Sequence, residues 1–269
     1  MRIGTNTAAM NTYSNLKSAN ASKAGSLAKL SSGLRINKAG DDAAGLSISE
    51  KMKNQISGLS QASRNAQDGI SLIQTAEGGL SETHSILNRM RDLSVQASNE
   101  TNSTEDLKAI DSEMTSLTTE IDRIAKTTKF NGKGLLFDTK AAPDQESKFV
   151  LQIGANTADE DAMTITIADM DKVGLGIDAL EDIITDPAAA NANALLNVDS
   201  IDAAIELVSA QRTSLGANQN RLEHTINNLS TTKENLSEAN SRITDVDMAE
   251  EMTSFTKSNI LAQAATSML

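Results

Sequence analysis

The most regular feature of the sequence is a column of apolar residues spaced seven apart near the C-terminal end. The column runs through Ile201, Val208, Leu215, Leu222, Leu229, Leu236 and Ile243. A companion column four residues further on is mixed, since it holds Ile205 but also Arg212 and Gln219. Such a repeat is typical of helices that pack side by side in a coiled-coil-like seam. The pattern predicts a long helix, which Asp199 or Ser200 can cap at its start.

A matching repeat predicts a second long helix over residues 47–98. Its apolar column runs through Met52, Leu59, Ala66, Ile73, Leu80 and Leu87. The same stretch contains Gly58, Gly69, Gly78 and Gly79. Each glycine destabilises a helix interior by about 1 kcal/mol relative to alanine. A helix of this composition needs neighbours, and glycine allows those neighbours to approach closely.

A third, shorter helix is predicted after the polar segment ASNETNSTEDL. Its apolar residues alternate at spacings of three and four, at Leu107, Ile110, Met114, Leu117, Ile121 and Ile124. Ser103 or Thr104 can cap this helix, and the acidic residues that follow suit the positive end of the helix dipole. The pair Asn131-Gly132 then predicts a turn.

The centre of the chain has a different character, and both prolines of the sequence, Pro143 and Pro187, fall there. The stretches FVLQIG (149–154) and MTITIADM (163–170) alternate β-branched with other residues, which predicts a short β-hairpin. Residues 185–197 are low in complexity and are expected to form a surface loop or a weak helix. Three helices and one hairpin together predict a slim, mainly α rod.

The two ends of the chain are diluted in apolar residues. Residues 1–35 and 244–269 mix a few large apolar side chains with Ala, Ser, Asn and Thr. Neither end has enough apolar area to offset the entropy that ordering it alone would cost. We therefore expect the ends to order by packing on each other or on further copies of themselves.

Composition narrows the range of functions. The formal net charge is −12, so the chain is a poor partner for nucleic acid, whose phosphates attract clustered Lys and Arg. There is no cysteine, which excludes disulfides and thiol nucleophiles. No apolar run is long enough to span a membrane, and the N-terminus lacks the apolar core of a cleaved secretory signal peptide.

No constellation of residues predicts an enzyme, a metal site or a cofactor. His84 and His224 are the only histidines, and neither has a second histidine or an acidic cluster at helical spacing. The sequence has no G-x-S-x-G motif, and no histidine accompanies a candidate nucleophile. We expect both histidines to be structural or exposed to solvent, and the protein to be neither catalytic nor cofactor-dependent.

Four long motifs resemble the bacterial flagellin family. They are LSSGLRINKAGDDAAGLSISEKM (30–52), QDGISLIQTAEGGLSETHSILNRMRDLSVQA (67–97), FNGKGLL (130–136) and ENLSEANSRITDVDMAEEMTSFTKSNILAQA (234–264). The resemblance covers roughly residues 1–140 and 195–269. Because the centre is short, the chain is similar to minimal flagellins that lack large outer domains.

The resemblance implies an elongated coiled-coil-like helical rod with one small β-hairpin region and paired terminal helices. It divides the chain into an N-terminal core helix and spoke (1–44), N-terminal rod helices (45–140), a variable hairpin and loop region (141–192), a C-terminal rod helix (193–240) and a C-terminal core helix (241–269). The last of these is expected to be truncated, because flagellins usually continue beyond ATSML. The helices that line the filament core are implied to pack through Ile3, Met10, Leu27, Leu30, Leu34, Phe255, Ile260 and Leu261.

The resemblance also assigns two surfaces. The spoke between core helix and rod corresponds to Gly33, Arg35, Gly40, Asp41, Asp42 and Gly45. Its glycines allow the chain to change direction. Asp41 and Asp42 are expected to form charge pairs with Arg35 and Lys38. Arg89, Leu93 and Glu113 match the positions that the vertebrate Toll-like receptor for flagellin reads, on a face that otherwise contacts a neighbouring subunit. Taken alone, Arg89 is expected on a solvated face, with an ion pair to Asp92 or a nearby acid.

The function implied is that of a structural subunit that polymerises into the flagellar filament and gives motility. Its implied partners are copies of itself, a flagellar export chaperone, the export apparatus, and the hook-associated and cap proteins. Export by the flagellar type III route would place it outside the cell without a cleaved signal peptide. The alternatives are a hook-associated junction protein, whose terminal motifs are related, and a signalling coiled coil, which should lack a central β pair.

Overall fold

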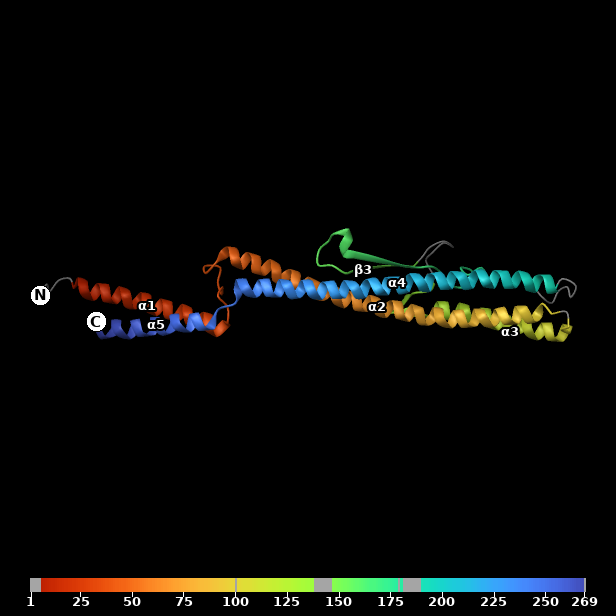
Figure 1. The fold of residues 1–269 in the computed structure, drawn as a ribbon, viewed down its shortest axis with the longest axis horizontal. Helices are drawn as coiled ribbons and strands as arrows, with labels where there is room; N and C mark the ends of the chain where they lie inside the picture. Colours follow the sequence, from red (N-terminus) through yellow and green to blue (C-terminus); the bar gives the residue numbers. More distant parts are fainter. Residues whose placement is uncertain (1–5, 100, 138–146, 179, 181–189, 269) are drawn as a thin grey trace. The chain divides into compact units, whose positions relative to one another are not determined.

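The structure is a computed structural model, and it describes residues 6–99, 101–137, 147–178, 180 and 190–268 (Figure 1). Within these residues, five α-helices dominate: α1 (Thr7–Ser32), α2 (Ala43–Ala97), α3 (Thr104–Thr127), α4 (Ala190–Thr244) and α5 (Met248–Met268). Two antiparallel pairs complete the fold: β1 (Lys129–Phe130) with β2 (Lys133–Gly134), and β3 (Ser147–Gln152) with β4 (Ala162–Ile167). A 3₁₀ turn, η1 (Asp159–Asp161), precedes β4. The prediction of a mainly α chain with a small β region is confirmed.

Backbone contacts group the chain into two units. One comprises residues 1–58 and 231–269, and the other comprises residues 59–230. Helices α2 and α4 contribute residues to both units. The division into five parts predicted from the sequence is finer than this grouping and stays a prediction.

The core of the unit 59–230 is built from the predicted seven-residue columns. The members of both columns within this unit are buried: Leu59, Ala66, Ile73, Leu80 and Leu87 on α2, and Ile201, Val208, Leu215, Leu222 and Leu229 on α4. Helix α3 adds Leu107, Ile110, Met114 and Ile121 to the same core. Periodic burial of this kind confirms the predicted seams, since a seven-residue apolar repeat keeps one helix face turned toward its partners.

Ion pairs join the helices around this core. Arg91 Nε lies 2.6 Å from Asp202 Oδ1 and so ties α2 to α4. Arg212 on α4 also reaches Glu77 on α2, at 3.6 Å. All four of these side chains are partly exposed, so water screens each pair and weakens its contribution to stability. The apolar columns, rather than the ion pairs, therefore hold the helices together.

The β3–β4 hairpin covers part of this core. Its register runs from Ser147 opposite Ile167 to Gln152 opposite Ala162, which confirms the predicted hairpin. Alternation along β4 turns Met163, Ile165 and Ile167 inward. A Cβ at Gly69 of α2 would lie 2.3 Å from Leu151 Cδ1, so glycine gives this strand room to approach the helix.

The start of one predicted helix differs from the structure. Helix α4 begins at Ala190 rather than near Asp199, because the Ala-rich turns before that residue are helix formers and Ala194 packs in the core. Residues 190–197 of the expected loop or weak helix therefore belong to a long helix, whereas residues 185–189 lie outside the described residues. Helix α3 begins as predicted, with Ser103 and Asp106 forming a capping box.

The predicted turn at Asn131-Gly132 joins β1 to β2. Both residues have positive φ, 49° and 78°, as a two-residue hairpin turn requires. The short strands on either side were not predicted.

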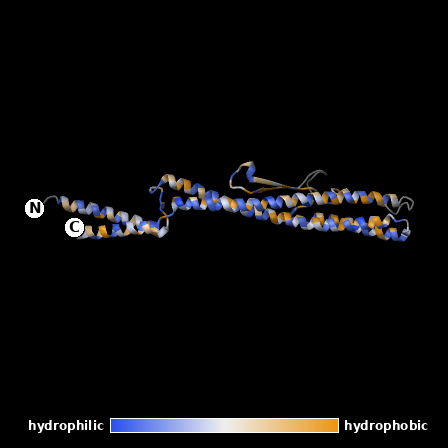
Figure 2. Cartoon of the chain, in the orientation of Figure 1, coloured by the Kyte–Doolittle hydropathy of each residue, from blue (hydrophilic) through white to orange (hydrophobic). Residues whose placement is uncertain are grey.

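Hydrophobic and hydrophilic positions alternate in short bands along the described helices (Figure 2). In the part of the chain that the structure describes, no helix has a stretch both long and apolar enough to cross a membrane.

Candidate functional site

The segment between α1 and α2 is held against the link between α4 and α5. The Arg35 N–H donates to the Thr244 carbonyl at 2.6 Å, and the Val246 N–H donates to the Gly33 carbonyl at 3.1 Å. The Arg35 guanidinium reaches the Ile243 carbonyl at 2.6 Å. These bonds join the two chain segments that lead into the terminal helices, and we call residues 33–45 the joint.

The two aspartates of the joint bind backbone N–H groups. Asp41 Oδ2 accepts from the N–H groups of Asn37 and Lys38, both at 3.0 Å. These bonds hold the pKa of Asp41 below its usual value. Asp42 Oδ1 accepts from the N–H groups of Ala44 at 3.1 Å and Gly45 at 2.9 Å, and so caps α2.

The expected charge pairing within the joint does not take the form of close ion pairs, although the charge of Lys38 contributes weakly to the lowered pKa of Asp41. No ion pair links Asp41 or Asp42 to Arg35 or Lys38 among the described residues. The physical reason is that free N–H groups at a turn and at a helix start lie closer to these short carboxylates than the long basic side chains do. The Arg35 guanidinium is instead taken up by a backbone carbonyl of α4.

At two of the three glycine positions of the joint, the structure explains why the residue is glycine. Gly33 ends α1 with φ of 71°, in the left-handed region that favours glycine. A Cβ at Gly45 would lie 2.5 Å from Asp42 Oδ2 and 2.8 Å from Ile36 Cδ1. Ile36 is only 4% exposed and anchors the joint. Gly40 has open space around it.

Helices α1 and α5 run antiparallel and pack through small side chains (Figure 1). The buried positions on this contact are Ala19 and Ser26 on α1, with Ser258, Ala262 and Ala265 on α5. Lys23 Nζ donates to Asn259 Oδ1 at 2.8 Å across the pair. Small residues let the two helix axes approach closely, but they bury little apolar area.

Several large apolar side chains of this pair remain exposed to solvent. Of the residues expected to pack in the core, Met10, Leu27, Ile260 and Leu261 are each more than half exposed. Leu30, Leu34 and Phe255 are half-buried, and Ile3 lies outside the described residues. Tyr13, Met248 and Met252 add to the exposed set. The isolated pair thus leaves several large apolar side chains uncovered.

The small-residue contact was not predicted from the sequence. Its signal was present, since Ser258, Ala262 and Ala265 follow the spacing of one helix face, and Ala19 and Ser26 are seven apart. Small residues carry no hydrophobic pattern, so a search for large apolar positions passes over them.

The structure pairs Arg89 with Glu113 on the surface, whereas Leu93, one helical turn further along α2, is buried. Arg89 Nη2 lies 2.8 Å from Glu113 Oε1, between α2 and α3, and both side chains are about half exposed. The expected ion pair of Arg89 is therefore present, with Glu113 as the partner. Leu93 is 2% exposed, so it lies in the core and not on the surface where the resemblance placed it.

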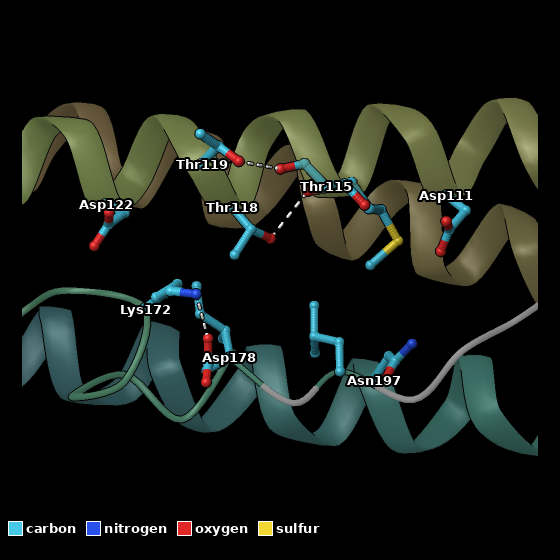
Figure 3. Close-up of a pocket in the computed structure, with 11 residues that line it drawn as sticks. Asp111, Thr115, Thr118, Thr119, Asp122, Lys172, Asp178 and Asn197 are labelled. Atoms are coloured by element: carbon cyan, nitrogen blue, oxygen red, sulfur yellow. Dashed lines mark hydrogen bonds and ion pairs between the residues drawn. The ribbon is translucent and has the colours of Figure 1, made fainter.

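A cavity of about 360 Å³ opens between α3, residues 172–180 and the start of α4 (Figure 3). Several of its polar side chains are engaged, because Thr118 Oγ1 and Thr119 Oγ1 donate to helix carbonyls and Lys172 Nζ pairs with Asp178. Asp122 Oδ1 is buried there without a hydrogen-bond partner in the described part of the chain. The pairing with Asp178 raises the pKa of Lys172. Among the described residues, no group of three or more His, Cys, Asp and Glu is placed to hold a metal ion.

Comparisons with known proteins match both ends of the chain. Residues 3–141 match the model for the bacterial flagellin N-terminal helical region, and residues 198–269 match that for the bacterial flagellin C-terminal helical region. A flagellin of Bacillus subtilis (strain 168) is 51% identical over 293 residues, covering 100% of this chain and 95% of the relative. A flagellin of Halalkalibacterium halodurans is 52% identical over 269 residues, covering 100% of this chain and 94% of the relative.

One solved structure adds information on the fold alone. A structure assigned to a flagellar hook-associated protein from Vibrio parahaemolyticus has a TM-score of 0.64 at 15% identity, covering 76% of this chain and 100% of that one. The two family models together span most of the chain, and the two flagellins match it from end to end. On this evidence the chain belongs to the bacterial flagellin family and is a structural subunit of the flagellar filament.

Proposed function

We propose that the subunit polymerises through the outward faces of α1 and α5, which pack against the same helices of neighbouring copies. The observation that carries this proposal is the inverted packing of the pair, with small residues inside and large apolar residues outside. Burying a large apolar side chain contributes about 1.5–3 kcal/mol. Several such side chains on each copy would supply the burial that the isolated pair lacks.

The joint would hold the two terminal helices in position while they pack. Its hydrogen bonds tie the segment after α1 to the segment before α5. The ends of the two helices are therefore held next to each other. We assign residues 1–44 and 241–269 to the filament core, and residues 45–140 and 193–240 to the rod. Residues 141–192 form the variable region in this assignment.

A substitution on the outward face tests this assignment. Ile260 is 60% exposed on α5, and Ile260→Gln is expected to raise the monomer concentration in equilibrium with filaments by roughly 10- to 100-fold, the equivalent of losing one buried side chain. The measurement is sedimentation of filaments grown from seeds. Val150 is 67% exposed on the β3–β4 hairpin, so Val150→Gln serves as the matched control.

Two outcomes show whether the terminal helices form the contact between subunits. Loss of assembly in Ile260→Gln with normal assembly in Val150→Gln supports the terminal helices as the contact. Equal assembly of Ile260→Gln and the unaltered chain would contradict it. Circular dichroism of the monomer checks that neither variant changes the helix content.

The route and partners of the subunit follow from the same assignment. A filament outside the cell requires export, and we propose the flagellar type III apparatus for it. An export chaperone would cover the exposed apolar faces before assembly, and hook-associated and cap proteins would contact the ends of the filament. A junction protein is not favoured as the alternative, because the full-length relatives at 51% and 52% identity are flagellins.

The exposed pair of Arg89 and Glu113 favours a second proposal, recognition of the free subunit by the vertebrate Toll-like receptor for flagellin. The pair presents a fixed charged group across α2 and α3, and the buried Leu93 would support it from beneath. Arg89→Ala is expected to lower receptor activation by roughly 10-fold, the effect of removing one interface arginine. The control is Arg123→Ala, which removes an exposed arginine paired with Glu120 on α3 alone. Unchanged activation in a receptor reporter assay would refute the proposal.

A further inference from the structure

The methionines of the chain fall into two groups. Met90, Met114, Met163 and Met170 are buried in the unit 59–230, each at most 4% exposed. Met10, Met248, Met252 and Met268 are 49–77% exposed, and all four lie on the terminal helices α1 and α5. Met52 is half-buried. Among the methionines that the structure describes, those that a reagent in water can reach therefore lie almost entirely on the two helices of the proposed assembly contact.

The surroundings of the exposed methionines are apolar. Met252 lines a shallow depression on α5 together with Ile260 and Leu261. Met10 lies one helical turn from the exposed Tyr13 on α1. Packing against a neighbouring copy would place each of these sulfur atoms in a dry contact. A polar group created there would lose its hydrogen bonds to water when the copies associate.

We propose that the exposed methionines of α1 and α5 are an oxidation site that controls polymerisation of the free subunit. The inference rests on the proposed assembly face. The oxidant is a peroxide: the thioether sulfur attacks one peroxide oxygen, the O–O bond breaks, and the other oxygen leaves as water once it has taken up a proton. Sulfur loses two electrons, and the product is methionine sulfoxide. The change converts a flexible apolar side chain into a polar one.

Oxidation and assembly then oppose each other. A subunit oxidised at Met10 or Met252 must bury a sulfoxide oxygen to join the filament. We expect the monomer concentration in equilibrium with filaments to rise at least about 10-fold, as when one unpaired polar group is buried. A subunit already in the filament has its methionines covered and reacts slowly. Reduction by the two methionine sulfoxide reductases restores the thioether, so the block is reversible.

The experiment treats monomer and seeded filament with hydrogen peroxide and maps sulfoxides by peptide mass spectrometry. The expected result is rapid oxidation of Met10, Met248, Met252 and Met268 in the monomer, and slow oxidation of the same residues in the filament. The buried methionines, of which Met163 and Met170 serve as internal references, should react slowly in both. Treated monomer is then mixed with untreated seeds, and growth is followed by sedimentation.

Matched variants assign the effect to the exposed sulfurs. Replacing Met10, Met248, Met252 and Met268 together by Leu keeps the apolar area and removes the reactive atoms, so assembly should become insensitive to peroxide. The variant Met163→Leu with Met170→Leu should remain sensitive. A second measurement uses only the unaltered chain: treatment of oxidised monomer with the two reductases should restore growth.

The outcomes distinguish this inference from the proposed assembly face. Fully oxidised monomer that grows on seeds like untreated monomer overturns the inference while leaving the assembly face intact. Oxidised monomer that fails to grow and stays inactive after complete reduction also overturns it. Normal assembly of Ile260→Gln contradicts the assembly face itself, and with it the reason for this inference.

Discussion

Two glycines of α2 predict opposite responses to the same substitution. Gly45→Ala and Gly78→Ala both add one Cβ to the same helix. At Gly78 nothing lies within 4 Å of that Cβ. Alanine is favoured over glycine in a helix by about 1 kcal/mol, so Gly78→Ala should stabilise the chain by about that amount.

At Gly45 the same Cβ meets two atoms that hold the joint. It would lie 2.5 Å from Asp42 Oδ2 and 2.8 Å from Ile36 Cδ1, closer than real contacts allow. Displacing Asp42 removes the cap of α2, which costs about 1 kcal/mol. Displacing Ile36, which is 4% exposed, loses part of the roughly 1.5–3 kcal/mol of its burial. Against a propensity gain of at most about 1 kcal/mol, we expect a net loss of about 1–2 kcal/mol.

Hydrogen exchange measures this loss where it occurs. The N–H groups of Arg35 and Val246 are bonded across the joint, and their exchange reports its opening. Gly45→Ala should speed their exchange by roughly 5- to 30-fold, and Gly78→Ala should leave it unchanged. Thermal unfolding followed by circular dichroism reports the gain at Gly78. If Gly45→Ala slowed exchange at these two amides, the argument that the joint requires glycine at this position would be refuted.

Two further predictions concern the helix core and the joint. Leu80 is 0% exposed, so Leu80→Ala should lower the free energy of unfolding in urea by about 2–5 kcal/mol. Leu207 on α4 is 49% exposed, so Leu207→Ala should lower it by less than about 1 kcal/mol. Equal losses would contradict the assigned core. The N–H groups of Asn37 and Lys38 lower the pKa of Asp41 in the folded chain. The contribution of Asp41 to folding stability should therefore be complete above the unfolded pKa of about 3.9, and it should be lost as the pH falls through the lower folded pKa. The difference in urea midpoint between the unaltered chain and Asp41→Asn should vanish in that acid range, and a difference that persisted there would count against the N–H bonds as its cause.

The aspartates of the joint show how far a sequence motif specifies its contacts. The resemblance placed Asp41 and Asp42 in the segment between two helices, and the structure has both between α1 and α2. Their partners could not be predicted, since carboxylates accept equally from basic side chains and from free N–H groups. The choice depends on which donors the fold brings within about 3 Å, and here backbone groups come first.

Leu93 on α2 is a second residue whose surroundings could not be predicted from a sequence motif. The resemblance placed it on a surface together with Arg89 and Glu113, but its side chain is buried and belongs to the core cluster. Adjacent helix positions point about 100° apart, so a neighbour in sequence is not a neighbour on the surface. The pairing of Arg89 with Glu113, 24 positions away, depends on how α2 and α3 pack.

By itself, the sequence determined the mainly α class, the existence of the three long apolar seams, the cap of α3 and the β3–β4 hairpin. These features follow from local periodicity, capping and turn chemistry, each of which depends only on residues close together in the sequence. Only the tertiary structure decided which side chains the terminal helices turn inward. There the small residues of α1 and α5 occupy the contact and the large apolar residues remain outside. The reason is that a helix with apolar residues on several faces can bury only one of them against a single partner, and the partner's shape selects which.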